Sequence, residues 1–448
     1  MNGSVIRPSV LLLILLTLTW GVARAGFIEV EPIEQDYADA SAYDQVITEI
    51  KVEGNKHTRE WVILQAIFSQ VGMTYTHELA KQDLLYLLRI GSFTSVFFTH
   101  EQVDDGIVLI IHVVEATPYI PSLSFALTQE NGVEIGPAFS SSNLLGYGAR
   151  ASVYARFGGA TNIGLKYADP QLMKNNWNIG YKFEYFHRER TNKLLDFGEI
   201  TDEFFLEYKH RINGDISLGP RFRYMYLKSD KDGITLSESN KDNVPSLGFF
   251  MEYDTRNGIY PTNGWYLDCE ASKYGMFGTD TDFWRLDLDT RRYVRLPFAG
   301  NTHSLAIYSY LTMTNGVIDE TLPSHQLFFI GGTNSVRGWS LASRNGRRQW
   351  LGTVEYWYEL MEQRKWKLWF IKIRMGFSLG AFADIGSAWN NQDEFTENMI
   401  GGGGVGFRLT LPVVTVIRFD MAMGEEGYSV RFFIGGNEKA AAQKFRVR

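Results

Sequence analysis

Two hydrophobic patterns divide the chain near Pro118. Between Val46 and about Ala116, apolar residues recur at helical spacing in two stretches and alternate with polar residues in three others. After Pro118, about sixteen segments alternate apolar and polar positions, and the helical spacing does not return. The first pattern predicts a small α+β domain of order β-α-α-β-β over residues 46–117, and the second predicts a mainly β structure over residues 118–436.

The two helical stretches of the predicted α+β domain each follow a threonine. Thr58 and Thr76 stand where a side-chain hydroxyl can cap the first turn of a helix. The buried face predicted for the first helix contains Trp61, Leu64, Ile67 and Phe68. Two strands follow, TSVFFTHEQV and GIVLIIHVVEA, and the residues Asp104-Asp105-Gly106 between them predict a hairpin.

Alternation and loop length together indicate a membrane barrel in the second part. In VTVIRFDMAMG (414–424), Arg418 and Asp420 share one face of the predicted strand, and apolar residues take the other. A soluble β-sandwich would show the same alternation. The connections differ in length, because 210–217 is tight whereas 185–201 and 228–243 are long and polar. This asymmetry is typical of outer-membrane barrels, so we predict a 16-stranded transmembrane antiparallel β-barrel.

The N-terminus predicts export. Arg7 is followed by the apolar run VLLLILLTLTW, and small residues precede a cleavage point after Ala25, as in a secretory signal peptide over residues 1–25. No later run reaches the roughly 18 apolar residues of a membrane-spanning helix. Residues 26–45 carry acids and no bases, which predicts a solvated leader or, alternatively, an acidic docking tail. Residues 437–448 predict a polar C-terminal tail.

Composition limits the kinds of partner that the protein can bind and the kinds of chemistry that it can support. The formal net charge of −7 and the isoelectric point near 5.7 argue against nucleic acid as a partner. Cys269 is the single cysteine, so no intramolecular disulfide can form. The eight histidines are scattered without metal-ligand spacing, and we predict no metal and no cofactor.

Two short motifs imitate catalytic ones. GFSLG (376–380) fits the nucleophile pattern G-x-S-x-G, and GGGGVG (401–406) resembles a phosphate-binding loop. Both chemistries need a helix after the motif, and the alternating pattern predicts strands instead, so we predict no enzyme. An outer-membrane phospholipase or protease with acids on its loops is the alternative.

The stretch IGGTNSVRGWS (330–340) contains the principal candidate site. It lies in the long connection 316–349, on the predicted long-loop side. Gly331 and Gly332 would let the backbone fold back into a confined space, where Arg337 needs a carboxylate partner. The alternative is an ordinary surface loop with a solvated arginine.

Carboxylates for Arg337 are expected on two neighbouring strands. In FSLGAFADIGSAW (377–389), alternation places Phe382, Asp384 and Gly386 on one face. Arg337 could bind Asp384 through a two-pronged guanidinium–carboxylate contact. Glu355, on the preceding predicted strand, is a second possible acceptor.

Four barrel motifs and the α+β domain together carry a family resemblance. SVRGW resembles the VRGF/Y loop signature, and GAFADIG the F-x-D-x-G strand motif, of the BamA/TamA superfamily of outer-membrane barrels with periplasmic POTRA domains, also called the bacterial surface antigen family. YDTRNGIYPTNGWYL and GGGGVGFRLTLP resemble its Y-D-x-R hairpin and its glycine-rich penultimate region, and the β-α-α-β-β domain resembles a POTRA domain. The resemblance implies that Val336, Arg337, Gly338 and Trp339 form the tip of a loop inserted into the barrel, where Arg337 pairs with Asp384.

The sequence departs from the family in three ways. Trp339 stands where the family has phenylalanine or tyrosine. Only one POTRA-like unit is predicted, which puts an extended accessory complex in doubt. A polar tail follows the last predicted strand, so the usual terminal aromatic signal is either internal at Phe432-Phe433 or displaced to Phe445.

The resemblance implies an outer-membrane factor, with its POTRA-like domain in the periplasm, that inserts or translocates other proteins. The expected partners are unfolded outer-membrane or secreted clients, the lipid bilayer, and periplasmic chaperones or accessory proteins. The closing seam would be weak where prolines remove amide donors and glycines loosen a strand end. The seam residues are Pro118, Pro121, Phe432, Phe433, Gly435 and Gly436. A dedicated secretion pore for one partner and a passive channel or surface barrel are the alternatives.

Overall fold

The computed structural model describes most of the chain. The described residues are 40–90, 92–128, 130–169, 179–212, 215–256, 261–296, 302–368, 371–391, 394–410, 416–424 and 427–435. The predicted signal peptide, residues 26–39 of the leader, Gly436 and the predicted tail lie outside them. Two compact units contain these residues: the first is the chain up to Leu123 with Pro137–Tyr154 and Leu165–Phe183, and the second is Ser124–Gly136, Ala155–Gly164 and the chain from Glu184 onward.

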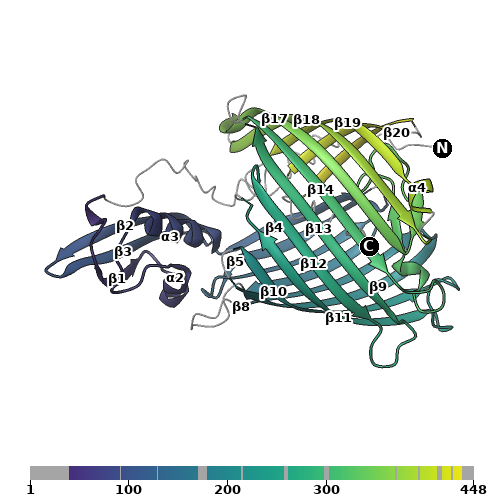
Figure 1. The fold of residues 1–448 in the computed structure, drawn as a ribbon, viewed down its shortest axis with the longest axis horizontal. Helices are drawn as coiled ribbons and strands as arrows, with labels where there is room; N and C mark the ends of the chain where they lie inside the picture. Colours follow the sequence, from purple (N-terminus) through teal and green to yellow (C-terminus); the bar gives the residue numbers. More distant parts are fainter. Residues whose placement is uncertain are drawn as a thin grey trace. The chain divides into compact units, whose positions relative to one another are not determined.

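The first unit begins with the small α+β domain (Figure 1). Its elements are η1 (Ala40–Ala42), β1 (Ile47–Glu53), α2 (Glu60–Ala66), α3 (His77–Ile90), β2 (Phe93–Val103) and β3 (Gly106–Glu115). The sheet order is β1-β3-β2, with β1 parallel and β2 antiparallel to the central β3. The predicted β-α-α-β-β order is confirmed, and β2 is an edge strand of its sheet.

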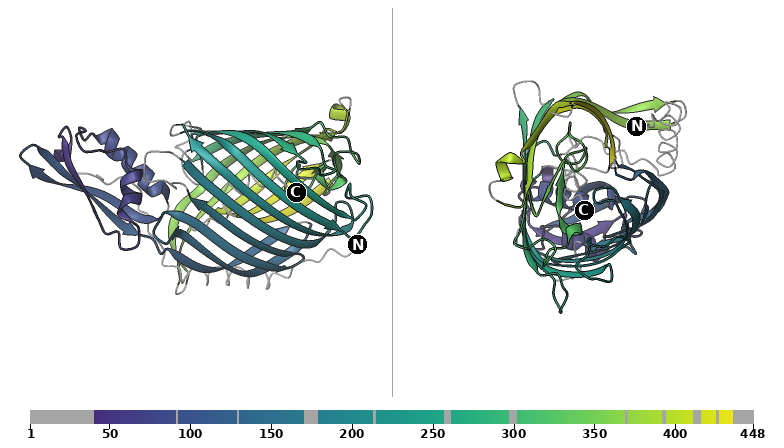
Figure 2. Two further views of the ribbon diagram at one scale, coloured as in Figure 1. Left: turned by 90° about the horizontal axis from the view of Figure 1, so that it is seen from below. Right: turned by 90° about the vertical axis from the view of Figure 1, so that its right-hand side faces the viewer.

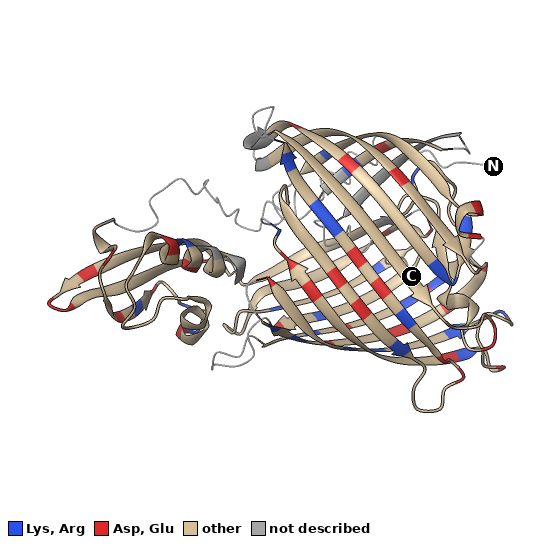
Figure 3. Ribbon diagram, in the orientation of Figure 1, with Lys and Arg blue, Asp and Glu red and all other residues tan. Residues whose placement is uncertain are grey.

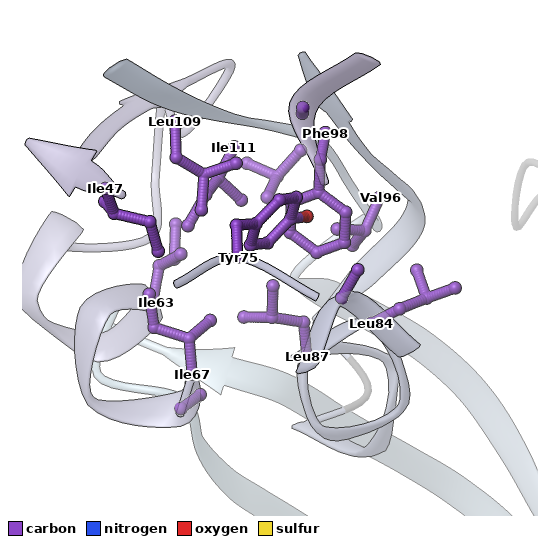
Figure 4. Packing of buried hydrophobic residues seen from close by; sticks show 14 of the residues in the cluster. Ile47, Ile63, Ile67, Tyr75, Leu84, Leu87, Val96, Phe98, Leu109 and Ile111 are labelled. Carbon is purple, nitrogen blue, oxygen red and sulfur yellow. The ribbon is translucent and has the colours of Figure 1, made fainter. Parts of the chain in front are cut away.

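One hydrophobic core holds both helices of this domain against its sheet. Ile63 of α2, Leu87 of α3 and Leu109 of β3 are fully buried. Figure 4 shows these side chains gathered around Tyr75, which is also fully buried. Burying each aliphatic side chain stabilises the fold by about 1.5–3 kcal/mol, which explains how this short α+β sequence holds two helices.

The prediction for helix α2 was wrong in its cap and in part of its face, although Ile67 of the predicted face is buried in the core. The helix spans only Glu60–Ala66 and buries Val62, Ile63 and Ala66. Leu64 and Phe68 of the predicted face are 38% and 43% exposed. The cap position belongs to Arg59, which makes no side-chain cap bond. The amide of Thr58 instead donates to the carboxylate of Glu115 at 2.5 Å, so strand β3 fixes the start of this helix.

A 16-stranded sheet forms the rest of the structure, and the predicted mainly β fold is confirmed. Its strands are β4 (Tyr119–Thr128), β5 (Gly132–Leu144), β6 (Ala149–Gly158), β7 (Thr161–Asp169), β8 (Ile179–Asn192), β9 (Phe197–Arg211), β10 (Ile216–Ser229), β11 (Lys241–Asp254), β12 (Gly264–Tyr274), β13 (Phe283–Leu296), β14 (His303–Thr314), β17 (Arg348–Leu368), β18 (Ile371–Trp389), β19 (Ile400–Thr410), β20 (Val416–Gly424) and β21 (Gly427–Gly435). They are neighbours in chain order from β4 to β21. The pairs from β9 to β21 are antiparallel.

The two faces of this sheet differ in chemistry. Figure 2 shows the strands of the second unit curving around, so that one face is enclosed. On the enclosed, inner face lie buried ionic residues such as Arg221, Asp287 and Asp384, and on the outer face lie exposed apolar residues such as Phe249 and Ile385. Figure 3 shows the charges spaced along neighbouring strands. This is the two-residue alternation that the sequence predicts.

One predicted loop is strand. Residues 185–201 were expected to form a long polar connection, but β8 continues to Asn192 and β9 begins at Phe197. Two buried charges of this stretch meet on the inner side, where Arg190 Nε donates to Glu199 Oε1 at 2.5 Å. A polar, charged sequence is therefore compatible with paired strands when the enclosed face is itself ionic.

The connection from β14 to β17 has its own structure. It contains η3 (Ser324–Gln326), β15 (Phe328–Ile330) and β16 (Arg344–Gly346), and β15 pairs with β16 in an antiparallel ladder. The short helix α4 (Glu394–Glu397) lies between β18 and β19. Among the described residues, none of the helices has the length and apolar character needed to cross a bilayer.

Candidate functional site

The candidate site is the loop between β15 and β16, residues 331–343, which we call the inner loop. The ladder of Phe328–Ile330 with Arg344–Gly346 closes its base. Gly331 has φ +104° and would place a Cβ only 2.3 Å from the carbonyl oxygen of Ser340, so this turn requires glycine. The amide of Gly331 donates to the hydroxyl of Ser335 at 2.8 Å, which draws the first half of the loop together.

Arg337 of the inner loop is fully buried against the inner face. Its Nε and Nη2 donate to the two carboxylate oxygens of Asp384 on β18 at 2.6 and 2.8 Å. The amide of Arg337 also donates to Asp384, at 3.1 Å, so this carboxylate holds both the side chain and the backbone of the loop. The guanidinium lies over the ring of Phe382 at 3.4 Å from its centroid. The predicted alternative, a solvated arginine, is wrong.

Two further carboxylates complete the surroundings of Arg337. Nη2 lies 3.0 Å from Oε1 of Glu355 on β17, and Nη1 donates to Oδ2 of Asp420 on β20 at 3.0 Å. Arginine keeps its proton in proteins, and these three carboxylates offset the cost of burying its charge. The side chain therefore stays charged and ties the loop to three strands at once.

The charge on the three acids is balanced locally. Arg418 Nε lies 2.9 Å from Asp420 Oδ2, and Arg408 Nη2 lies 3.5 Å from Glu355 Oε2. With Arg337, this gives three guanidinium groups and three carboxylates, which we call the arginine network. A balanced, hydrogen-bonded set avoids the large cost of an isolated buried charge, although removing one member would restore that cost.

Glycines let the loop backbone lie against strands β19 and β20. A Cβ at Gly402 would stand 2.0 Å from the carbonyl oxygen of Arg337. Gly338 has φ +96°, and a Cβ there would lie 2.6 Å from the backbone of Gly424 and Met423. Side chains at these positions would push the loop out of reach of the acids.

Two apolar residues of the motif fill the space beside Arg337. Val336 is fully buried, and a Cβ at Gly386 would lie 3.1 Å from its Cγ2. The indole Nε1 of Trp339 donates to the carbonyl oxygen of Gly401 at 2.8 Å. Phenylalanine could pack here but could not make this bond, so tryptophan adds an anchor of its own.

Of the predicted site residues, one group comes together and another does not. The structure places the motif 336–339 against the predicted residues Asp384, Glu355, Phe382 and Gly386. Gly332, with φ +98°, belongs to the same loop. The seam residues lie elsewhere: Pro118 precedes β4, Pro121 is within β4, and Phe432, Phe433 and Gly435 are in β21.

Sequence reasoning did not assign Asp420, Arg408 and Arg418 to the site. The signal for two of them was present, because alternation puts Arg418 and Asp420 on one face of β20. Nothing in the sequence indicates that β20 lies within reach of a loop that precedes it by about 80 residues. Only the curvature of the sheet brings them together.

The site has the chemistry of an anchor. Ser378 of the GFSLG motif lies within strand β18, so the turn from strand to helix that a nucleophile elbow requires does not follow it. Among the residues that the structure describes, no group of three or more His, Cys, Asp or Glu side chains is placed to hold a metal ion. What the geometry can do is hold one loop rigidly against β17, β18, β19 and β20.

Comparison with known protein families identifies the family of this chain. A model of the Omp85 superfamily domain matches residues 143–437, about two thirds of the chain. The chain belongs to the Omp85 superfamily. It is therefore an outer-membrane β-barrel with a POTRA-like domain, and a non-enzymatic membrane factor.

Proteins similar to this Omp85 barrel include BamA and CdiB. The outer membrane protein assembly factor BamA of Nitratidesulfovibrio vulgaris is 23% identical over a match of 376 positions, which covers 78% of this chain and 44% of the relative. The chain thus spans less than half the length of that relative. BamA from Haemophilus ducreyi lacking POTRA domains 1–3 matches with a TM-score of 0.61 at 16% identity, covering 97% of this chain and 94% of the other. CdiB from Escherichia coli matches with a TM-score of 0.63 at 13% identity, covering 96% and 85%. These structural likenesses show the shared fold.

Proposed function

We propose that this Omp85 protein is an assembly factor that inserts β-barrel clients into the outer membrane. Supporting observations are the family, the barrel with one POTRA-like domain, and the buried anchor of the inner loop. In this proposal residues 1–25 are a cleaved signal peptide, 26–45 a leader, 46–117 the periplasmic POTRA-like domain, 118–436 the barrel and 437–448 a tail.

The anchoring of the inner loop carries the proposal. Arg337 binds β17, β18 and β20, and Trp339 binds the backbone of β19. Strand β21, at the end of the sheet, pairs with β20. The loop therefore holds together β17 to β20, the strands that precede β21. Its position can govern how readily β21 separates from β4, the strand at the other end of the sheet.

The seam itself is proposed to open for clients. Pro121 removes an amide donor within β4, and Gly435 ends β21 opposite Val416. Fewer ladder bonds at these ends would lower the cost of separating the two strands. An incoming client strand could then pair with a free edge through main-chain hydrogen bonds.

Client delivery is assigned to the edge of the POTRA-like domain. Strand β2 pairs with β3 on one side and is the edge of a three-stranded sheet. An extended client segment adds to such an edge by β-augmentation, which needs no particular client sequence. Unfolded outer-membrane proteins are the proposed clients, and periplasmic chaperones are the proposed source of them.

The test is insertion of an unfolded barrel into vesicles that contain the purified protein. Wild type is expected to accelerate insertion over empty vesicles, and Arg337→Ala is expected to remove at least about 90% of that acceleration while leaving a folded, heat-resistant barrel. The reason is that Asp384, Glu355 and Asp420 lose a shared cation, a loss of roughly 3–5 kcal/mol for a buried pair.

Arg291 provides the matched control. It is also fully buried, and it binds both oxygens of Asp289 at 2.8 and 2.6 Å, but it lies on β13 and both partners belong to one strand. Arg291→Ala should keep the insertion activity if the loop anchor is what matters. Equal loss in both variants would make buried charge in general responsible.

A secretion role is the second outcome that the assay can reveal. If the folded wild-type protein does not accelerate insertion, yet an exported passenger crosses the same vesicles, the protein is a dedicated secretion pore. Steady conductance without dependence on either client would instead indicate a passive channel.

A further inference from the structure

The hairpin of β17 and β18 continues past both neighbouring strands. The two strands have 21 and 19 residues, about twice the 9–11 of a strand that crosses a bilayer. Strand β14 begins at His303, opposite Tyr358, and β19 ends at Thr410, opposite Gly376. Residues 364–368 and 371–375 lie beyond these ends and pair with each other. We call these two segments the hairpin extension.

The composition of the hairpin extension is unusual for a chain of net charge −7. Its segments read RKWKL and IKIRM, which are five cations, five apolar residues and no acid. Elsewhere on the sheet, several arginines of the inner face have carboxylate partners, as Arg221 has Glu207, Asp268 and Glu270. The hairpin extension has no acid of its own to balance its cations.

The register sorts these residues by face. Lys365 is opposite Arg374 and Lys367 is opposite Lys372, so four cationic positions share one face of the ladder. The other face has the pairs Arg364 with Met375, Trp366 with Ile373 and Leu368 with Ile371. Like charges directly opposite each other destabilise a ladder, so the cationic face needs an anionic counterpart.

The apolar face continues the lipid-facing side of the barrel. Leu379 and Ile385 on the outer face of β18 are 46% and 40% exposed. Positions of the same parity toward the start of β18 are Phe377, Met375, Ile373 and Ile371, all apolar. By register and sequence, the hairpin extension is therefore an amphipathic two-stranded ribbon, in which the positions of the outer face, apolar except for Arg364, continue past the ends of β14 and β19.

The end at which this ribbon emerges follows from the strand order. The β17–β18 turn follows an even number of strands counted from β4, as does the β5–β6 turn, and β4 itself starts at that end after the POTRA-like domain. In the proposed orientation this is the periplasmic end. The inner loop, between β14 and β17, lies at the opposite end.

We propose that the hairpin extension is an interfacial anchor that binds anionic phospholipid headgroups of the periplasmic leaflet. Amphipathic elements with Lys and Arg on one face and Trp, Leu or Ile on the other lie in the headgroup region, and each cation near an anionic surface adds about 1 kcal/mol of attraction. Continuity of the apolar face with the barrel's outer face and the unbalanced charge of the other face select a lipid surface as the partner. This surface goes beyond client handling, and its test requires no client.

The test follows a dye on the hairpin extension of the full-length protein. Cys269→Ser removes the single cysteine, and Gln363→Cys allows an environment-sensitive dye to be attached beside the extension. The protein is reconstituted in phosphatidylcholine bilayers with increasing phosphatidylglycerol. We expect a blue shift of emission that rises with phosphatidylglycerol and is lost in high salt, because screening weakens headgroup attraction.

Two triple variants test whether lipid binding depends on the lysines of the hairpin extension or on the net charge of the protein. In Lys365→Gln, Lys367→Gln, Lys372→Gln, the apparent affinity for phosphatidylglycerol should fall by about tenfold or more, given the contribution of each cation. Lys193→Gln, Lys228→Gln, Lys241→Gln makes the same change of charge at exposed positions of the opposite end and should leave the response unchanged. Heat resistance on a gel verifies that each variant is folded.

Three outcomes would overturn the proposal. They are an equal response in pure phosphatidylcholine, an equal loss in both triple variants, and a shift in phosphatidylcholine that requires an added acidic peptide. The last would assign the face to a protein partner. Insertion activity is measured separately, so failure of the lipid anchor and failure of the assembly function are distinguishable.

Discussion

At the scale of single residues, the site depends on where side chains are missing as much as on where they are present. Arg337 reaches Asp384 only because the loop backbone lies directly on β19 and β20. Gly402 and Gly338 provide that approach, since a Cβ at either would overlap backbone atoms. The arginine network and the glycines therefore act together to hold the inner loop against the sheet.

We predict that Gly402→Ala displaces the inner loop without altering any charge. The new Cβ would stand 2.0 Å from the carbonyl oxygen of Arg337, and backbone cannot rotate away as a side chain can. Gly401→Ala is the matched control on the same strand, because its Cβ would meet nothing closer than 3.7 Å. Hydrogen exchange of a peptide covering 331–343 should be faster in Gly402→Ala alone. Equal exchange in the two variants would contradict this account.

Trp339 allows a second prediction at this scale. Trp339→Phe introduces the family's usual residue type but removes the bond from Nε1 to the carbonyl of Gly401. The loss of one such bond, with a buried carbonyl left unpaired, should weaken loop closure by about 1–3 kcal/mol. Hydrogen exchange of the same peptide measures this directly, and unchanged protection would show that packing alone holds the indole.

At the scale of elements, ionic groups tie strands together across their neighbours. Arg221 on β10 binds Glu207 on β9 and both Asp268 and Glu270 on β12. It passes over β11 at Gly248, where a Cβ would lie 2.7 Å from Oε1 of Glu270. Four consecutive strands are thus held by one guanidinium, away from the inner loop.

We predict that Arg221→Met lowers the thermal resistance of the barrel but leaves the inner loop protected. The change leaves the carboxylates of Glu207, Asp268 and Glu270 without this cation on the inner face. Breaking a buried ion pair in this way costs roughly 3–5 kcal/mol. Arg223→Met is the milder control, since Arg223 pairs with Glu270 and is more exposed. The gel-shift temperature on heating distinguishes the two. An equal shift would mean that bridging four strands adds nothing.

The POTRA-like domain gives a pH-dependent prediction at the same scale. Burial alone would raise the pKa of Glu115, but hydrogen bonds from Thr58 and from the amide of His57 lower it below its ordinary value of 4.5. A lowered pKa means stability that is present above the unfolded-state value and is lost as pH falls through the folded-state value. Segment 54–66 should therefore open on acidification.

Hydrogen exchange of the full-length protein, corrected for intrinsic rates, checks this pH effect. Glu115→Gln should show the open behaviour of segment 54–66 already at neutral pH. Glu101→Gln, on the exposed side of β2 with a 3.5 Å surface pair to Lys51, is the control and should behave as wild type. Protection of the segment that does not change with pH would show that Glu115 does not hold the start of α2.

At the scale of the whole molecule, the protein is an outer-membrane barrel whose N-terminal segment was predicted to direct export. We predict that protein extracted from the outer-membrane fraction begins at Gly26, because the small residues before Ala25 fit signal peptidase. Intact-mass measurement decides this. A mass that retains residues 1–25 would exclude cleavage there, and Ala25→Arg should block processing if the site is correct.

The mainly β fold with one preceding α+β domain could be predicted from the chain, because two-residue alternation and helical spacing are local properties. The loop motif and its first acceptors, Asp384 and Glu355, were named from spacing and resemblance. The full length of β8 and β9 was not predicted, because strands whose charges face an enclosed ionic interior have the polar sequence of a loop. The start of helix α2 was misjudged because a distant carboxylate, Glu115, holds the segment just before it in place of a side-chain cap.

The sequence by itself determined the alternation of faces, the order of elements and the motif that carries Arg337. Those features follow from backbone geometry and from residue types within a few positions of each other. The tertiary structure alone decided that Asp420, Arg408 and Arg418 join the site, and that Gly402 lies under the loop. The physical reason is that curvature of a long sheet sets distances between strands far apart in the chain, and no local pattern records that curvature.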